Sequence, residues 1–409
     1  MPGESPLNMM QPKPVPRPAP RRRTAGGGGR PRTARRRIWP VVLPVCIVVL
    51  LAAGWCALWY YAAGVANREM AAWMQREAAA GRVYSCGSQT IGGFPFRLAF
   101  DCTIVTAALN SVQPPLTVTA KAVTVAAEVY HPTLLIADIA SPLTVVAPSE
   151  PASFAANWSR GELSVSGLPP ELKAASGTFD QPHLDRVTGG AATALFTADH
   201  AEVQGRIVGG SANDNPVLDA LIRFAAATAP TLHPALAAPT AGEIDAVFYG
   251  FKDLTPKPWP VRFREMHDAN GKIEITRLRL AQTDAIVVGT GTLTVNANGK
   301  LDGLIRVAIA GLDQIIPKLG VERLIGRGVD RLGGGSGQAQ QGLNALERLM
   351  PGLGNVVRDS ANAGIIDNLN KMGQPTEIDK KPAVLLPLNF SDGFVSLGMV
   401  PLGEVPPLF

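Results

Sequence analysis

An uncharged apolar segment near the N-terminus constrains this chain more than any other feature. It reads "IWPVVLPVCIVVLLAAGWCALWYY" and covers residues 38–61. As a helix rising about 1.5 Å per residue it would be about 36 Å long, more than the roughly 30 Å hydrocarbon layer of a bilayer. Aromatic residues of the kind that anchor helices at membrane interfaces lie at its ends: Trp39, Trp55, Trp59, Tyr60 and Tyr61. We predict a transmembrane helix over residues 38–61.

The residues before the segment predict its orientation. Residues 1–37 carry ten basic side chains and one acidic side chain, and basic flanks stay in the cytoplasm. We therefore expect an uncleaved signal anchor in the inner membrane, with the N-terminus cytoplasmic and the body periplasmic. The alternative is a cleaved signal peptide with Gly64-Val65-Ala66 as the small-residue site, although the apolar core of such peptides has roughly 7–15 residues. Both interpretations export the body.

The basic segment itself, residues 1–37, alternates Pro with other residues and contains four consecutive glycines. It has nothing to bury, so we expect a disordered cytoplasmic tail. Its arginine clusters fit either nucleic-acid binding or helix orientation combined with attraction to anionic lipid. No aromatic residue interleaves the arginines, so we favour the membrane role and expect no nucleic-acid partner.

Two of the four cysteines, Cys86 and Cys102, flank the turn Gly92-Gly93-Phe94-Pro95. They follow the predicted span on the exported side, where disulfides persist, and the turn can bring their Cα atoms together. The alternative is a metal site, but no histidine or second cysteine pair nearby supplies the other ligands. We predict a Cys86–Cys102 disulfide.

The rest of the chain favours strands. Residues 66–81 are rich in helix formers and end at Gly81, which predicts a helical stalk over residues 62–82. Two later runs, "PLTVTAKAVTVAAEV" and "KIEITRLRL", alternate apolar residues and then change phase. Such a phase change indicates either a bulge or a strand whose two faces exchange burial. Long bent strands of this kind suit a large curled sheet.

Turn dipeptides indicate a meander. Asn270-Gly271, Asn298-Gly299 and Asp392-Gly393 each separate two apolar runs and suit tight hairpins. Short helices are expected over residues 216–230 and 312–320 and in a helical insert near 338–365. The predicted fold is α+β: an N-terminal transmembrane helix followed by a large, mostly antiparallel, curled β-sheet body over residues 83–409 with a few short helices.

No chemical motif emerges. The five histidines are scattered without metal-binding spacing, no G-x-S-x-G is present, and Gly299-Lys300 lacks the rest of a phosphate loop. We therefore predict no catalytic, metal or cofactor-binding residue and no cofactor. An envelope hydrolase stays as an alternative, because catalytic residues can be scattered along a sequence.

Three stretches together carry a family resemblance: "CGSQTIGGFPFRLAFDC", "GTGTLTVNANGKLDGLIRVAIAG" and "LNFSDGFVSLGMVPLGEVPPLF". They resemble the DUF2125 family of α-proteobacterial proteins over most of residues 38–409. That family carries no assigned activity, so the likeness implies compartment and architecture. More loosely, one N-terminal span followed by strands with Gly-Phe-Pro turns is similar to AsmA-type envelope proteins, in which curled sheets form an apolar groove for lipid.

Two functional hypotheses follow. In the first, the curled sheet offers an apolar groove to lipid or another amphiphile in envelope biogenesis or maintenance; in the second, the sheet edge and the helical insert hold an envelope protein partner. The same apolar residues could instead fill an ordinary sandwich core. The candidate groove residues are Val118, Val123, Val125, Leu278, Leu280, Leu293, Val295, Ile305, Val307 and Ile309.

Overall fold

A computed structural model describes residues 39–112, 114–148, 150–167, 171–319 and 353–409. The tail and most of the predicted insert lie outside the described residues. The predicted fold class is confirmed, because strands dominate and pair antiparallel throughout. The described helices are α1 (Trp39–Ala79), α2 (Trp259–Asp268), α3 (Leu312–Leu319), α6 (Leu353–Met372) and the 3₁₀ turn η1 (Pro234–Ala237).

Helix α1 covers the predicted span from Trp39 onward and continues beyond it. Its segment Val42–Ala79 is long and apolar enough to cross a membrane. The helix former-rich stretch after residue 61 stays helical to Ala79, and Gly81 then takes a left-handed φ of 79°. By contacts the chain divides into two units, residues 1–54 and 55–409. The remaining description concerns the second unit, whose β-sheet part after α1, residues 82–409, is called the body.

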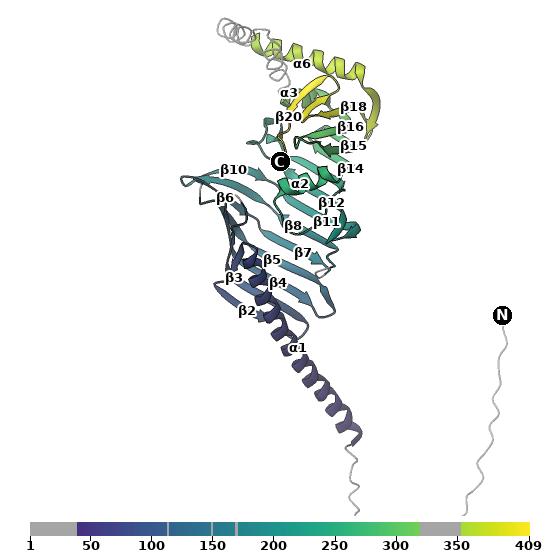
Figure 1. Ribbon diagram of the computed structural model, residues 1–409. Helices are drawn as coiled ribbons and strands as arrows, with labels where there is room; N and C mark the ends of the chain where they lie inside the picture. Colours follow the sequence, from purple (N-terminus) through teal and green to yellow (C-terminus); the bar gives the residue numbers. More distant parts are fainter. Residues whose placement is uncertain (1–38, 113, 149, 168–170, 320–352) are drawn as a thin grey trace, which may run out of the picture. The chain divides into compact units, whose positions relative to one another are not determined.

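The body is one antiparallel sheet whose strands mostly pair with their sequence neighbours (Figure 1). Its main path begins with β1 and β2, which both pair with β3, and then proceeds strand by strand to β18. The strands of this path are β1 (Arg82–Ser85), β2 (Ser88–Gly92), β3 (Arg97–Leu109), β4 (Leu116–Glu128), β5 (His131–Val146), β7 (Arg160–Ser166), β8 (Ala174–Asp180), β11 (His200–Ser211), β12 (Asp214–Ala227), β13 (Thr240–Phe248), β14 (Ile273–Gln282), β15 (Ala285–Val295), β16 (Leu301–Ala310) and β18 (Lys381–Ser391).

The sheet forks at β5. The first half of β5 pairs with β7, and its second half pairs with β6 (Ala152–Asn157). Strand β6 continues through β9 (His183–Thr188) to β10 (Ala191–Thr197), which forms a side branch. At the other end, β18 also pairs with β17 (Gln374–Ile378) and β19 (Phe394–Leu397), and β19 pairs with β20 (Val400–Glu404).

Two local predictions are wrong. Residues 216–230 form β12 rather than a helix, because Leu218, Ala220 and Ile222 alternate along one side between β11 and β13; sheet pairing overrides the helix propensity of the alanines. The run before Asn270-Gly271 is helix α2 rather than a strand, so that turn joins a helix to β14. The hairpins at Asn298-Gly299 and Asp392-Gly393 are confirmed, as is the short helix at residues 312–319.

Both phase changes coincide with a slip in strand pairing. In β14 the pairing with β15 slips between Ile275 and Leu278, so a bulge brings both onto the same side of the sheet. In β4 the pairing with β5 slips between Ala120 and Ala122, next to Ile104 of β3, which is unpaired and has a φ of 51°, so a bulge also marks this phase change. The bulge that the sequence suggested as one alternative therefore occurs in both strands.

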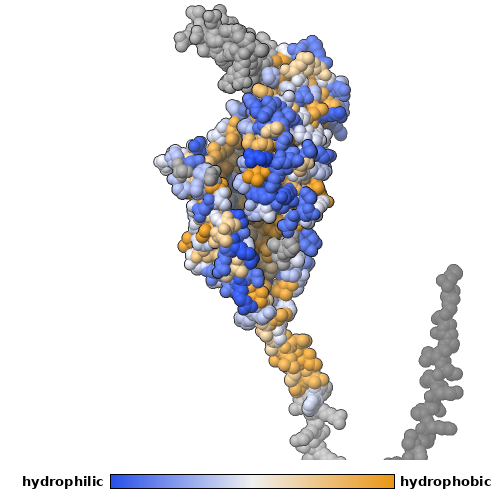
Figure 2. Space-filling model, viewed as in Figure 1, coloured by the Kyte–Doolittle hydropathy of each residue, from blue (hydrophilic) through white to orange (hydrophobic). Residues whose placement is uncertain are grey.

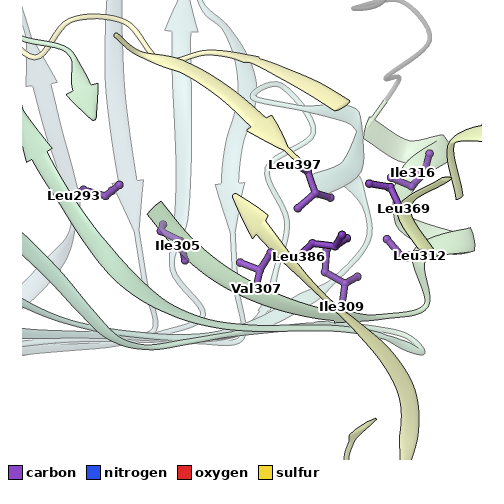
Figure 3. Packing of buried hydrophobic residues seen from close by; sticks show 9 residues of the cluster. All are labelled: Leu293, Ile305, Val307, Ile309, Leu312, Ile316, Leu369, Leu386 and Leu397. Atoms are coloured by element: carbon purple, nitrogen blue, oxygen red, sulfur yellow. The ribbon is translucent and has the colours of Figure 1, made fainter. Parts of the chain in front are cut away.

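The largest hydrophobic core lies at the C-terminal end of the sheet. Helices α3 and α6 pack on one side of β15, β16 and β18, and Ile316 and Leu369 from these helices meet Leu386 of β18 (Figure 3). A second core forms where Met266 of α2 packs with Phe251 and Val295. Both cores cover the same side of the sheet.

Candidate functional site

One side of the sheet carries an unbroken apolar row. The strand registers align one residue from each of thirteen strands, and none of the thirteen is polar. This apolar row consists of Ile91, Phe100, Val125, Ala137, Leu163, Gly177, Val203, Ile222, Ile244, Leu278, Gly289, Val307 and Leu386. Because paired residues in a sheet share a face, the row marks a continuous apolar side, which we call the apolar face.

The opposite side is polar from β3 to β14. The neighbouring positions there form an aligned series: Asp101, Thr124, Asp138, Glu162, Thr178, Glu202, Arg223, Glu243 and Arg279. Charges of opposite sign alternate at its end, where Arg223 lies 3.6 Å from both Glu202 and Glu243. These side chains pair with one another on the polar side. From β3 to β14 the sheet therefore has one charged side and one apolar side.

The apolar face is covered at the C-terminal end and open in the middle. Val307 and Leu386 are buried beneath α3 and α6. In the middle strands none of the described helices covers the row, and Val203 is 49% exposed and Ile222 41% exposed in the described structure. The space-filling view shows a hollow between the β6–β10 branch and the rest of the body, with hydrophobic residues along it (Figure 2). We call this open part, from β4 to β14, the trough.

The predicted groove residues divide into three groups. Val123, Val125, Leu278 and Leu280 lie half-buried on the apolar face. Val118 is also half-buried, but it lies beyond the bulge in β4, where it pairs with Ala107 and Val145. The remaining five are on the apolar face but buried in the two cores, as the filled-core alternative expects: Leu293, Val295, Ile305, Val307 and Ile309.

The central residues of the trough are absent from the sequence-based set. Ile222 was hidden because residues 216–230 resemble a helix, whereas Val203 and Ile244 lie in alternating runs, "AEVQGRI" and "GEIDAVF", that indicate strands. Leu163 also lies in such a run, "GELSVSG". Period-two alternation could therefore have found three of these four residues.

Polar chemistry in the body is limited. A cavity of about 360 Å³ on the polar side is lined by Ser176, Arg206, Asp219 and Asp245 among others. Arg206 Nε donates to Asp219 Oδ2 at 2.7 Å, and burial together with a hydrogen bond to Asp219 raises the pKa of Asp245. Among the described residues no three side chains of the His, Cys, Asp and Glu types gather as a metal site would require.

The predicted disulfide is confirmed. Cys86 and Cys102 are bonded, with Cα atoms 5.6 Å apart. Cys102 lies on β3, and Cys86 lies between β1 and β2, the two strands that share the edge of β3. The bond therefore fastens the N-terminal end of the sheet, where the apolar row begins.

Comparison of the sequence with known protein families found a matching family. The model of the family described as "Uncharacterized protein conserved in bacteria (DUF2125)" matches residues 59–406. Comparisons with curated proteins and with solved structures gave no match. Because the family model covers the sheet from its first strand to its last, the chain belongs to this bacterial DUF2125 family.

Proposed function

We propose that this protein is a single-pass inner-membrane protein whose periplasmic body binds the acyl chains of lipid, or of another amphiphile, in the trough, in the service of envelope biogenesis or maintenance. The observation that carries the proposal is the apolar row, which stays free of polar residues in the middle strands, where none of the helices in the described part of the chain covers it. A protein that needed only a folded core would cover these residues or replace them with polar ones.

The dimensions of the trough suit an acyl chain. From Val125 on β4 to Leu278 on β14 the row crosses eight strands. At about 4.8 Å between strands this is about 34 Å, and one acyl chain spans only about 15 Å, half of a bilayer core. Each methylene removed from water contributes about 0.8 kcal/mol, so a chain lying along the row gains binding energy without any polar contact.

The sequence and α1 support the compartment. Helix α1 supplies a segment that can cross a membrane, the basic tail favours a cytoplasmic N-terminus, and the Cys86–Cys102 bond suits an oxidising exterior. The likeness to AsmA-type proteins points the same way, as an analogy of architecture.

The test is photo-crosslinking in native membrane vesicles that contain a phospholipid with a photoreactive acyl chain. Lipid around α1 labels the span in any case, so the informative peptides are those that carry Leu163, Val203 and Ile222. We expect these to be labelled. Ile222→Glu should reduce their labelling about tenfold, because an unpaired carboxylate against an acyl chain costs at least about 1.4 kcal/mol.

Leu304→Glu is the matched control. Leu304 is 39% exposed against 41% for Ile222, and it lies on the polar side, since it pairs with Thr292 and Asn389. Its labelling should equal that of the wild type. Labelling confined to the span, or an equal loss in both variants, would overturn the proposal. If those peptides stay unlabelled by lipid, and a photoreactive amino acid placed at position 203 in cells cross-links to a single envelope protein, the partner-holding alternative is correct.

A further inference from the structure

Aromatic residues gather around one turn of the body. The chain has 24 aromatic residues (13 Phe, 6 Trp and 5 Tyr), and six of them lie around the turn between β2 and β3 as two groups of three neighbouring rings, which together we call the aromatic collar. Neighbouring rings within it have centroids 5.3–6.4 Å apart. The collar consists of Trp55, Trp59, Tyr60, Phe94, Phe96 and Tyr130.

Helix α1 holds the turn between β2 and β3 through two indoles. Nε1 of Trp55 donates to the carbonyl oxygen of Pro95 at 3.0 Å, and Nε1 of Trp59 donates to that of Arg97 at 3.1 Å. The turn needs Gly93, which has a φ of 93° and whose Cβ would lie 2.5 Å from the carbonyl oxygen of Arg97. These two hydrogen bonds therefore hold the turn beside Trp55 and Trp59 of helix α1.

Four of the six rings in the aromatic collar remain exposed. Trp59 is buried by the contact with Phe94, but Tyr60, Phe94, Phe96 and Tyr130 are each about half exposed or more. A soluble surface gains nothing from four neighbouring exposed aromatic rings. Phenylalanine and tyrosine side by side are, in contrast, typical of the boundary between acyl chains and headgroups.

The sequence of α1 predicts the depth of the aromatic collar relative to the membrane. A helix that enters a roughly 30 Å hydrocarbon layer at Trp39, where α1 begins, leaves it after about 20 residues, close to residue 58. Trp55 and Trp59 lie on either side of that point, and the turn is bonded to both. The exposed rings of Phe94 and Phe96 therefore belong to the level at which hydrocarbon gives way to headgroups.

We infer that the aromatic collar is a membrane-contacting surface that seats the turn at residues 92–96 in the outer leaflet of the inner membrane. The inference rests on the proposed membrane anchor and deepens the proposed trough. Ile91 and Phe100, the first two residues of the apolar row, lie on the strands that this turn joins. The collar thus holds the beginning of the row against the bilayer, where an acyl chain can pass from leaflet to trough.

The test measures the depth of single labelled residues in the full chain. Cys46 and Cys56 are the free cysteines, so a Cys46→Ser, Cys56→Ser background, labelled without reductant, accepts an NBD fluorophore at Phe94→Cys or Phe96→Cys. The proteins are reconstituted in phosphatidylcholine vesicles with or without lipid spin-labelled near the headgroup end of the acyl chain. Phe394→Cys is the control, since Phe394 and Phe94 are both 49% exposed.

We expect labels at positions 94 and 96 to lose most of their emission to the spin-labelled lipid, and the label at 394 to keep its emission. Quenching at 94 and 96 no greater than at 394 would overturn the inference. A Cys46→Ser chain labelled at Cys56 separates the two proposals. If Cys56 is quenched while 94 and 96 are not, the anchor stands and the collar fails; if Cys56 is not quenched, the anchor itself fails.

Discussion

The indole of Trp158 lies against the backbone of Gly161, and its Nε1 donates to the carbonyl oxygen of Ile139 at 2.7 Å. Gly161 is on the apolar face, paired with Phe179, whose ring meets the indole edge-on at 5.1 Å between centroids. The absence of a side chain at Gly161 therefore lets Trp158 lie flat beside the trough with its only polar atom satisfied.

Gly161→Ala should destabilise the protein. The new Cβ would lie 2.8 Å from Cδ1 of Trp158, so the indole must leave its hydrogen bond or the strands must separate, at a cost of about 1–3 kcal/mol. Gly205→Ala is the control, because its Cβ would meet only Cδ1 of Leu218, at 3.6 Å. Thermal unfolding of the full chain in detergent measures both, and equal effects would contradict the packing described.

The covered and open parts of the apolar face should respond differently to truncation. Leu386 is 1% exposed under α6, and Ile222 is 41% exposed. We expect Leu386→Ala to lower the free energy of unfolding by about 2–5 kcal/mol, and Ile222→Ala to lower it by less than about 1 kcal/mol. Denaturant titration of the two variants checks this; a large loss for Ile222→Ala would mean that the trough is filled.

Local signals account for the parts that the sequence predicted well. A 24-residue run without a charge is compatible with few structures other than a membrane helix. The Gly-Gly-Phe-Pro turn between Cys86 and Cys102 reverses the chain and so brings the two cysteines close enough to bond. The phase change between Ile275 and Leu278 is likewise local, and it marks the bulge in β14.

Which strands pair, and which strands a helix covers, depend on residues far apart in the sequence. Ile222 and Val307 both lie in apolar strands, and only the position of α3 and α6 leaves one open and buries the other. The fork that pairs β5 with both β6 and β7 also has no signature in either strand. A set of candidate residues drawn from alternation alone therefore mixes trough with core.

Loss of the disulfide should loosen the N-terminal end of the sheet. Cys86 and Cys102 are 16 residues apart in sequence, and opening a loop of that size costs about 3 kcal/mol of stability in the chain-entropy account. We expect the reductant TCEP to lower the unfolding temperature of the wild type. A Cys86→Ala, Cys102→Ala variant should already unfold at the lower temperature and respond no further to TCEP; a response there would assign the effect elsewhere.

The loop before α2 should give the body a measurable acid sensitivity. Lys257 Nζ donates to Asp253 Oδ2 at 2.7 Å and to Glu265 Oε1 of α2 at 2.7 Å, while Thr255 N donates to Asp253 Oδ1 at 2.9 Å. Hydrogen bonds from Lys257 and Thr255 lower the pKa of Asp253 from its ordinary 3.8 to about 2. A lowered pKa means that the ionised carboxylate stabilises the folded state.

That stabilisation is complete above the unfolded-state pKa of 3.8 and disappears as the pH falls through the folded-state pKa of about 2. Asp253→Asn should therefore be less stable than the wild type at pH 7, by an amount that stays constant down to about pH 5 and narrows toward pH 2. Unfolding midpoints across this range measure the difference. In a Lys257→Met background the cost of Asp253→Asn should shrink; a difference that ignores both pH and Lys257 would show that Asp253 stabilises the loop by some means other than its charge.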